Sequence, residues 1–228
     1  GRAVLPVHEL IPGATFDVSD GILACARGTQ ACPAANTLAI DTDTGVFTFT
    51  FWEPGAATAG VRAMRVTESP IPSITHLWTN DSLPGGSGSS PTVSPDGARV
   101  YVTDNVDSLH ALDAETGESI WSHVIGYSAG GSVSLSPEGL VMPAGGGVSP
   151  LLAVRDDGDA GTEVWREAGL LNRGIPTQVA GGLSYATVGA GAFGIDLVVV
   201  DTATGQELDR ESIPGTPIFS VGTTVGPD

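Results

Sequence analysis

The chain has 228 residues, of which 41% are apolar and 15% charged, and its formal net charge is −17. This length and apolar content predict one globular domain, residues 1–228, and 32 glycines with 16 prolines predict many turns. All nine basic residues are arginine, which excludes lysine Schiff-base chemistry. The excess negative charge disfavours nucleic acid and anionic membranes as partners, because few cations are present to neutralise phosphates.

The two cysteines, Cys25 and Cys32, lie in a loop expected between two early strands. An even number at short spacing predicts one Cys25–Cys32 disulfide, with two reduced buried thiols as the alternative. A disulfide implies a secreted, periplasmic or other cell-envelope location. No apolar run approaches the 18 or so residues that cross a bilayer, so no transmembrane segment is expected.

Short strands joined by tight turns are expected along the chain, and no stretch predicts a helix. In the clearest unit the expected strands are 91–93, 99–102, 108–113 and 119–123, with a turn at 94–97. The same order returns with a strand at 132–135 and a turn at 136–139, and again between residues 176 and 205. The chain is therefore predicted to repeat one antiparallel unit.

A strand-turn-strand phrase recurs and is clearest at residues 109–121, where it ends in Trp121. Tryptophan returns at Trp78 and Trp165, so the period is 43 to 44 residues. Such a period is typical of one four-stranded blade of a β-propeller. Asp and Thr suit the tight turn of the phrase, and its Gly supplies a positive φ. Each tryptophan is expected to pack against a neighbouring sheet and to hold the blades together.

The pattern Ala-x-Asp-x-x-Thr-Gly-x-x-x-Trp at residues 111–121 resembles the tryptophan-docking repeat of the PQQ-like propeller family. That family includes quinoprotein dehydrogenases and outer-membrane assembly lipoproteins. The resemblance implies an all-β propeller of four-stranded antiparallel blades. The early copy, residues 39–49, has Phe49 in place of the tryptophan, and the late copy, residues 201–209, has Asp209 there.

The length predicts about five blades, whereas the family that the chain resembles usually has seven or eight. Phe49 and Trp78 are close in sequence, so the second unit is expected to lack two strands. Residues 217–221 suggest the first strand of a blade that is incomplete at the C-terminus. Two arrangements stay open: residues 3–10 complete that blade and close a small ring, or the chain is an arc of a larger propeller.

Four carboxylates, Asp156, Asp157, Asp159 and Glu163, fall within one turn. Oxygen ligands at this density suit calcium, although their spacing is not that of an EF-hand. A solvated turn of a docking hairpin is the alternative. No other cofactor is expected, and the four histidines do not have ligand spacing.

Two short motifs are interpreted as loops. Residues 126–130 fit Gly-x-Ser-x-Gly, and residues 189–194 fit the dinucleotide-binding fingerprint. Each of those motifs requires a helix immediately after it, whereas strands are expected here. No catalytic residue is predicted.

The repeat, together with the lack of a matched catalytic set, predicts a noncatalytic binding scaffold, secreted or in the cell envelope, with an unidentified protein partner in a possible larger assembly. Loops 104–107, 145–150 and 189–194 are repeat-equivalent and are expected to share a binding face. One alternative is a quinone-dependent or carbohydrate-active enzyme, with carboxylates converging on the propeller axis. The other is the sensor or interaction domain of a longer receptor. The cofactor-binding set of the quinone enzymes is not matched residue by residue.

Overall fold

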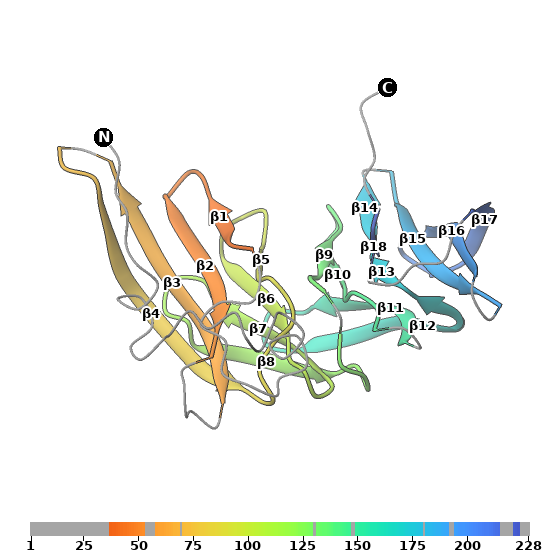
Figure 1. Cartoon of the computed structure of the whole chain (residues 1–228), viewed down its shortest axis with the longest axis horizontal. Helices are drawn as coiled ribbons and strands as arrows, with labels where there is room; N and C mark the ends of the chain where they lie inside the picture. The colour runs from red at the N-terminus through yellow and green to blue at the C-terminus, as the bar shows by residue number, and fades with distance from the viewer. Residues whose placement is uncertain are drawn as a thin grey trace, which may run out of the picture. The chain divides into compact units, whose positions relative to one another are not determined.

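A computed structural model describes residues 37–52, 58–68, 70–129, 131–146, 149–179, 181–191, 194–214 and 221–223. Cys25 and Cys32 lie outside these ranges. The described elements are all strands, which confirms the all-β prediction (Figure 1). They are β1 (Ala39–Asp41), β2 (Val46–Phe51), β3 (Ala59–Thr67), β4 (Ser73–Leu83), β5 (Thr92–Val93), β6 (Arg99–Thr103), β7 (Ser108–Asp113), β8 (Ser119–Val124), β9 (Ser134–Leu135), β10 (Leu140–Met142), β11 (Ser149–Asp156), β12 (Gly161–Asn172), β13 (Gly174–Ile175), β14 (Thr177–Val179), β15 (Leu183–Ala190), β16 (Gly194–Asp201), β17 (Glu207–Ile213) and β18 (Val221–Gly222).

The chain divides into two compact units, which are described separately. The first unit comprises Gly1–Val106 and His110–Ser119, and the second comprises Asp107–Leu109 and Ile120–Asp228. Consecutive strands pair in four-stranded antiparallel groups, in the order β1-β2-β3-β4 and β5-β6-β7-β8. Four-stranded antiparallel sheets of this kind are the blades of a propeller.

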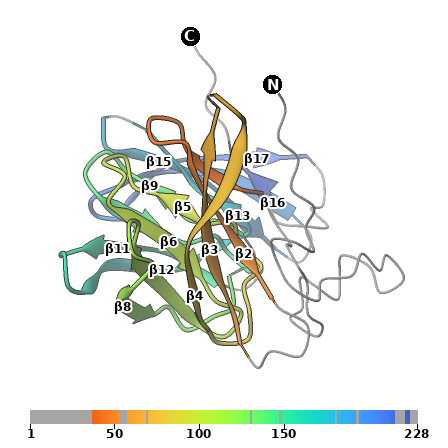
Figure 2. The same cartoon turned by 90° about the vertical axis from the view of Figure 1, so that its left-hand side faces the viewer.

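The first sheet has the order β1-β2-β3-β4, and Figure 2 shows its strands β2, β3 and β4. This order corrects the sequence-based assignment of the early copy. Its Asp-x-x-Thr-Gly turn joins β1 to β2, the first two strands, whereas the Trp121 copy joins the third strand to the fourth. Phe49 accordingly lies in the second strand, where it stacks on Phe47 and packs near Met64. The two strands expected to be missing before Trp78 are therefore present, because the early copy supplies them.

The misassignment has a local physical cause. The carboxylate of Asp41 accepts hydrogen bonds from the Asp43 amide at 2.9 Å and from the Thr44 hydroxyl at 2.6 Å, and Gly45 has a φ of 69°. This chemistry closes any tight antiparallel hairpin, whichever strands it joins. The turn phrase therefore identifies a hairpin without identifying its place in the blade.

The core of the first unit lies between its two sheets. Val61 and Ala63 of β3, Trp78 of β4 and Val100 and Val102 of β6 form one buried cluster. Alternate residues of a strand point to the same face, which is why the odd-numbered positions of β3 and the even-numbered positions of β6 contribute. Burial of this apolar surface contributes about 25 cal/mol per Å² removed from water.

The second unit contains two further groups of four strands. Strands β9 to β12 form one group and β14 to β17 the other. The single pair Asn172↔Val188, between β12 and β15, links them into one eight-stranded sheet. Strand β18 pairs in parallel with β13. An unfinished blade was expected to begin at residues 217–221, of which 217–220 lie outside the described residues.

The two short motifs that the sequence analysis interpreted as loops are not followed by a helix in the described part of the chain. Residues 126–129 belong to the link between β8 and β9, and residues 189–191 lie at the end of β15. The strand context that argued against both catalytic motifs is thus present.

Candidate functional site

Three buried tryptophans, Trp78, Trp121 and Trp165, each connect one group of four strands to the next. Each lies in the fourth strand of its group and packs on the hairpin between the third and fourth strands of the next group. The indole of Trp78 donates to the carbonyl of Ala114 at 2.9 Å, and that of Trp165 donates to the carbonyl of Thr202 at 2.8 Å. A buried indole N–H needs a hydrogen-bond acceptor, and each carbonyl supplies one. The same bond also fixes the orientation of the ring.

The hairpin glycines have a second role beyond their positive φ. A Cβ atom on Gly205 would lie 2.6 Å from ring atoms of Trp165, and one on Gly117 would overlap the ring of Trp78. The indole therefore lies flat against a backbone that has no side chain. Glycine is required here for close approach as well as for turn geometry.

The lock formed by Trp121 differs because its acceptor hairpin has one extra residue. Its indole donates to a side-chain oxygen of Asp156, Oδ1, at 3.0 Å. The positive φ of this turn falls on Gly158, at 99°, while Gly161 receives the ring without a positive φ. The extra residue thus separates the turn glycine from the docking glycine.

A side-chain contact that sequence reasoning missed accompanies two of the locks. Asn80, two residues after Trp78, donates to the Gly117 carbonyl at 2.8 Å and to the Ser119 hydroxyl at 3.1 Å. At the equivalent positions of the next lock, His123 Nε2 lies 3.7 Å from Glu163 Oε2. Residues two apart on a strand share a face, so this spacing from the tryptophan was the available signal.

Three of the four carboxylates of the acidic turn already interact with other side chains of the protein. Asp156 accepts from Trp121, Asp157 accepts from the Arg155 guanidinium at 2.6 Å, and Glu163 pairs with Arg166. Asp159 is exposed. In the described part of the chain, no cluster of three or more His, Cys, Asp or Glu side chains is arranged to hold a metal ion. Calcium at this turn stays a prediction.

Hydrogen bonds lower the pKa of several carboxyl groups. The Thr116 amide lowers the pKa of Asp113, the Ser94 hydroxyl lowers that of Asp96, and Arg166 lowers that of Glu163. A carboxyl group whose pKa is lower in the folded than in the unfolded protein stabilises the folded state when the group is ionised. The resulting stability is complete above the unfolded pKa, near 4, and is lost as the pH falls through the folded pKa.

We therefore expect the urea midpoint of unfolding to fall as the pH is lowered from about 5 to about 2. The variant Asp113→Asn removes one of these groups and should lose less stability over the same interval. Circular dichroism in urea at several pH values measures both. An unfolding midpoint that stays constant across this interval would show that the turn carboxylates do not contribute.

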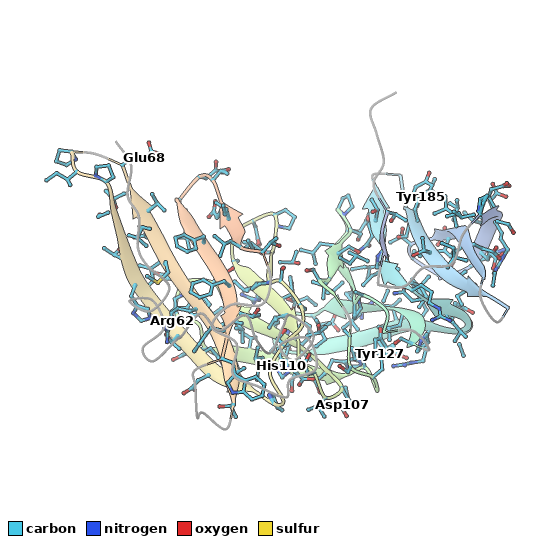
Figure 3. All side chains as sticks on the ribbon, viewed as in Figure 1. Arg62, Glu68, Asp107, His110, Tyr127 and Tyr185 are labelled. Carbon is cyan, nitrogen blue, oxygen red and sulfur yellow. The ribbon has the colours of Figure 1, made fainter. Side chains whose placement is uncertain are left out.

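One further ionisable pair lies inside the first unit. His110 lies on β7 (Figure 3). Its Nε2 atom is 2.8 Å from Asp104 Oδ2, and Asp104 is only 1% exposed. Asp104 also accepts from the Val106 amide at 3.0 Å. Asp104, the first residue of loop 104–107, is therefore tied to strand β7 by its contact with His110. The sequence prediction treated His110 as an ordinary strand histidine and did not identify this partner.

The predicted binding loops occupy equivalent places in their sheets. Loops 104–107, 145–150 and 189–194 each connect the second strand of a sheet to the third. In the second unit, the amide of Gly145 donates to the Gly174 carbonyl at 2.9 Å, and a Cβ atom on Gly189 would lie 3.1 Å from Nε of Arg173. The described parts of the last two loops therefore border the same short segment after β12.

Comparison with known proteins agrees with this architecture. Residues 71–224 match the family model described as outer membrane protein assembly factor BamB. Protein Rv3035 of Mycobacterium tuberculosis is 30% identical over 216 residues, which is 93% of this chain and 52% of that protein. The chain thus spans about half the length of this curated relative.

Two solved structures share the fold. BamB from Moraxella catarrhalis has a TM-score of 0.59 at 16% identity, over 86% of this chain and 53% of that one. Quinohemoprotein alcohol dehydrogenase ADHIIG from Pseudomonas putida HK5 has a TM-score of 0.52 at 17% identity, over 74% and 32%. Among the described residues, no helix is long and apolar enough to span a membrane. The docking repeat and the family match, taken together, show that the chain is a PQQ-like β-propeller that belongs to the BamB family.

Proposed function

We propose that the chain is a noncatalytic scaffold of the cell envelope or the extracellular space, which binds a protein partner. The observation that carries the proposal is the repeated lock, in which an indole from one sheet packs on a glycine of the next. Within each unit, elements tied together in this way present their connecting loops in a fixed geometry. Binding that needs little reorganisation loses less conformational entropy.

Family membership supports an assembly role, since the matching family is described as an outer membrane protein assembly factor. In each unit, the loops between second and third strands are the proposed binding face. Two of them border one segment in the second unit, and in the first unit Val106 is 51% exposed at the tip of its loop. An exposed apolar side chain held by a rigid strand pair suits a protein interface.

The charge of the chain indicates the kind of partner. A net charge of −17 attracts neutral or basic protein surfaces and repels acidic ones. Because such attraction is screened by salt, the association rate should fall as ionic strength rises. An association rate that changes little with ionic strength would indicate that the partner binds away from the charged surface.

Site-specific photo-crosslinking in the native full-length protein tests the proposed face. A photoreactive residue at Val106 should capture a partner in the native envelope or secreted fraction. The matched control is Ile71, which is 76% exposed on the connection between β3 and β4. Connections from third to fourth strands lie at the other end of an antiparallel sheet, so this position should capture less.

Two results would contradict the proposal. Equal capture at Val106 and Ile71 would show that the second-to-third loops are not the binding face. A quinone that co-purifies with the native protein, detected by its absorbance, would favour a redox enzyme over a scaffold.

A further inference from the structure

A cavity of about 460 Å³ opens in the first unit between its two sheets. Its apolar wall includes Val46 and Leu77 of the first sheet and Val93 and Val100 of the second. Its polar groups include Thr48, Arg65 and Glu115. This volume is typical of small-ligand sites, and the lining combines apolar side chains with the polar and charged ones that fix the orientation of a ligand.

A buried hydroxyl with no partner lines this cavity. Thr48 is only 2% exposed, and its Oγ1 atom has no hydrogen-bond partner. Thr50, on the same strand and also buried, donates to the carbonyl of Ser89 at 3.2 Å. Buried polar side-chain atoms are nearly always hydrogen-bonded, so an unpaired one beside a cavity indicates a missing polar partner.

The two charged groups available to a ligand have opposite signs. The side chains of Arg65 and Glu115 make no hydrogen bond or ion pair with other described residues. The nearby carboxylate of Asp41 is already engaged by the amide of Asp43 and the hydroxyl of Thr44. A purely anionic ligand would meet Glu115 and a purely cationic one would meet Arg65, so each would be disfavoured by one group.

We propose that this cavity binds a short zwitterionic ligand with an apolar side chain, namely an amino acid or a dipeptide. The ligand carboxylate pairs with Arg65, whose guanidinium presents a fork of donors that suits a carboxylate. The ammonium group faces Glu115, the apolar side chain packs on the valines and Leu77, and a polar atom bonds the Thr48 hydroxyl. The site lies between sheets and is bordered by the turn residues Thr44, Gly97 and Glu115, not by loop 104–107. It is independent of the proposed scaffold role.

Isothermal titration of the full chain with leucine and with leucyl-leucine tests the proposal. Binding of either ligand supports it, and the tighter of the two shows whether the natural source is a free amino acid or a peptide. N-acetyl-leucyl-leucine lacks the ammonium group and leucyl-leucinamide lacks the carboxylate, so each should bind at least about tenfold more weakly. Failure of both leucine and leucyl-leucine to bind at millimolar concentration would overturn the proposal.

Isosteric variants locate the site. Thr48→Val should reduce affinity about fivefold to tenfold without loss of stability, because the hydroxyl it removes is unpaired in the free protein. The control Thr50→Val removes a bonded hydroxyl outside the cavity, so it should lower stability and leave affinity unchanged. Similarly, Arg65→Gln and Glu115→Gln should weaken binding, whereas Glu118→Gln, on the same hairpin as Glu115, should not. Wild-type affinity in Thr48→Val and Arg65→Gln would show that the ligand binds elsewhere and that the assignment is wrong.

Discussion

Replacing Trp165 with alanine is expected to lower the free energy of unfolding of the second unit by about 3–5 kcal/mol. Trp165 is buried in a cluster with Leu140, Met142 and Leu151, and its ring covers Gly205. The substitution removes that contact and leaves the carbonyl of Thr202 without the indole donor. Urea unfolding followed by circular dichroism gives the change, and hydrogen exchange shows whether the loss is confined to strands β9 to β17.

The variant Trp165→Phe separates the hydrogen bond from the packing. It keeps an aromatic ring but removes the N–H donor, so the expected loss is smaller, about 1–2 kcal/mol. The chain is thus expected to rank wild type, Trp165→Phe and Trp165→Ala in that order of stability. If Trp165→Ala unfolded within about 1 kcal/mol of the wild type, the tryptophan would not lock the sheets.

Gly161→Ala is expected to cost about 1–3 kcal/mol, since its Cβ atom would lie 2.7 Å from Cζ3 of Trp121. Gly161 has no positive φ, so the cost arises from the ring contact and not from backbone strain. Thermal and urea unfolding of the single variant measure the loss. This position isolates the close-approach role of the docking glycine.

Gly169→Ala is the matched control. Gly169 lies on the same strand, β12, it has no positive φ, and a Cβ atom there would meet nothing within 4 Å. The control should be neutral or stabilising by up to about 1 kcal/mol, because alanine restricts the unfolded chain. In a Trp121→Ala background the cost of Gly161→Ala should shrink, and a cost that stayed the same would exclude the ring as its cause.

The sequence was sufficient to predict the blades because the signals that define them are local. Asp113, Thr116 and Gly117 form a turn from interactions within five residues, and Trp121 follows at a fixed spacing. The period of 43 to 44 residues then counts the units, and the resemblance to the PQQ-like family is confirmed by the family match. The three docking tryptophans were identified for the same reason.

The same locality caused the error at residues 39–49. A turn of Asp, Thr and Gly specifies a hairpin, but the pairing of β2 with β3 decides that this hairpin comes first in its sheet. That pairing joins residues on either side of residues 53–57, and no short motif encodes it. Strand position within a blade is thus a property of long-range pairing.

The amino-acid sequence by itself determined that this protein is built from repeated antiparallel hairpins and that its net charge is −17, and it predicted that Trp78, Trp121 and Trp165 join the hairpins. Only the tertiary structure decided which polar groups meet: Trp121 with Asp156, His110 with Asp104, and Thr48 with a cavity in place of a partner. The physical reason is that turns and periodicity depend on neighbours in sequence. The partners of a buried polar atom, in contrast, come from whichever strands the fold brings beside it.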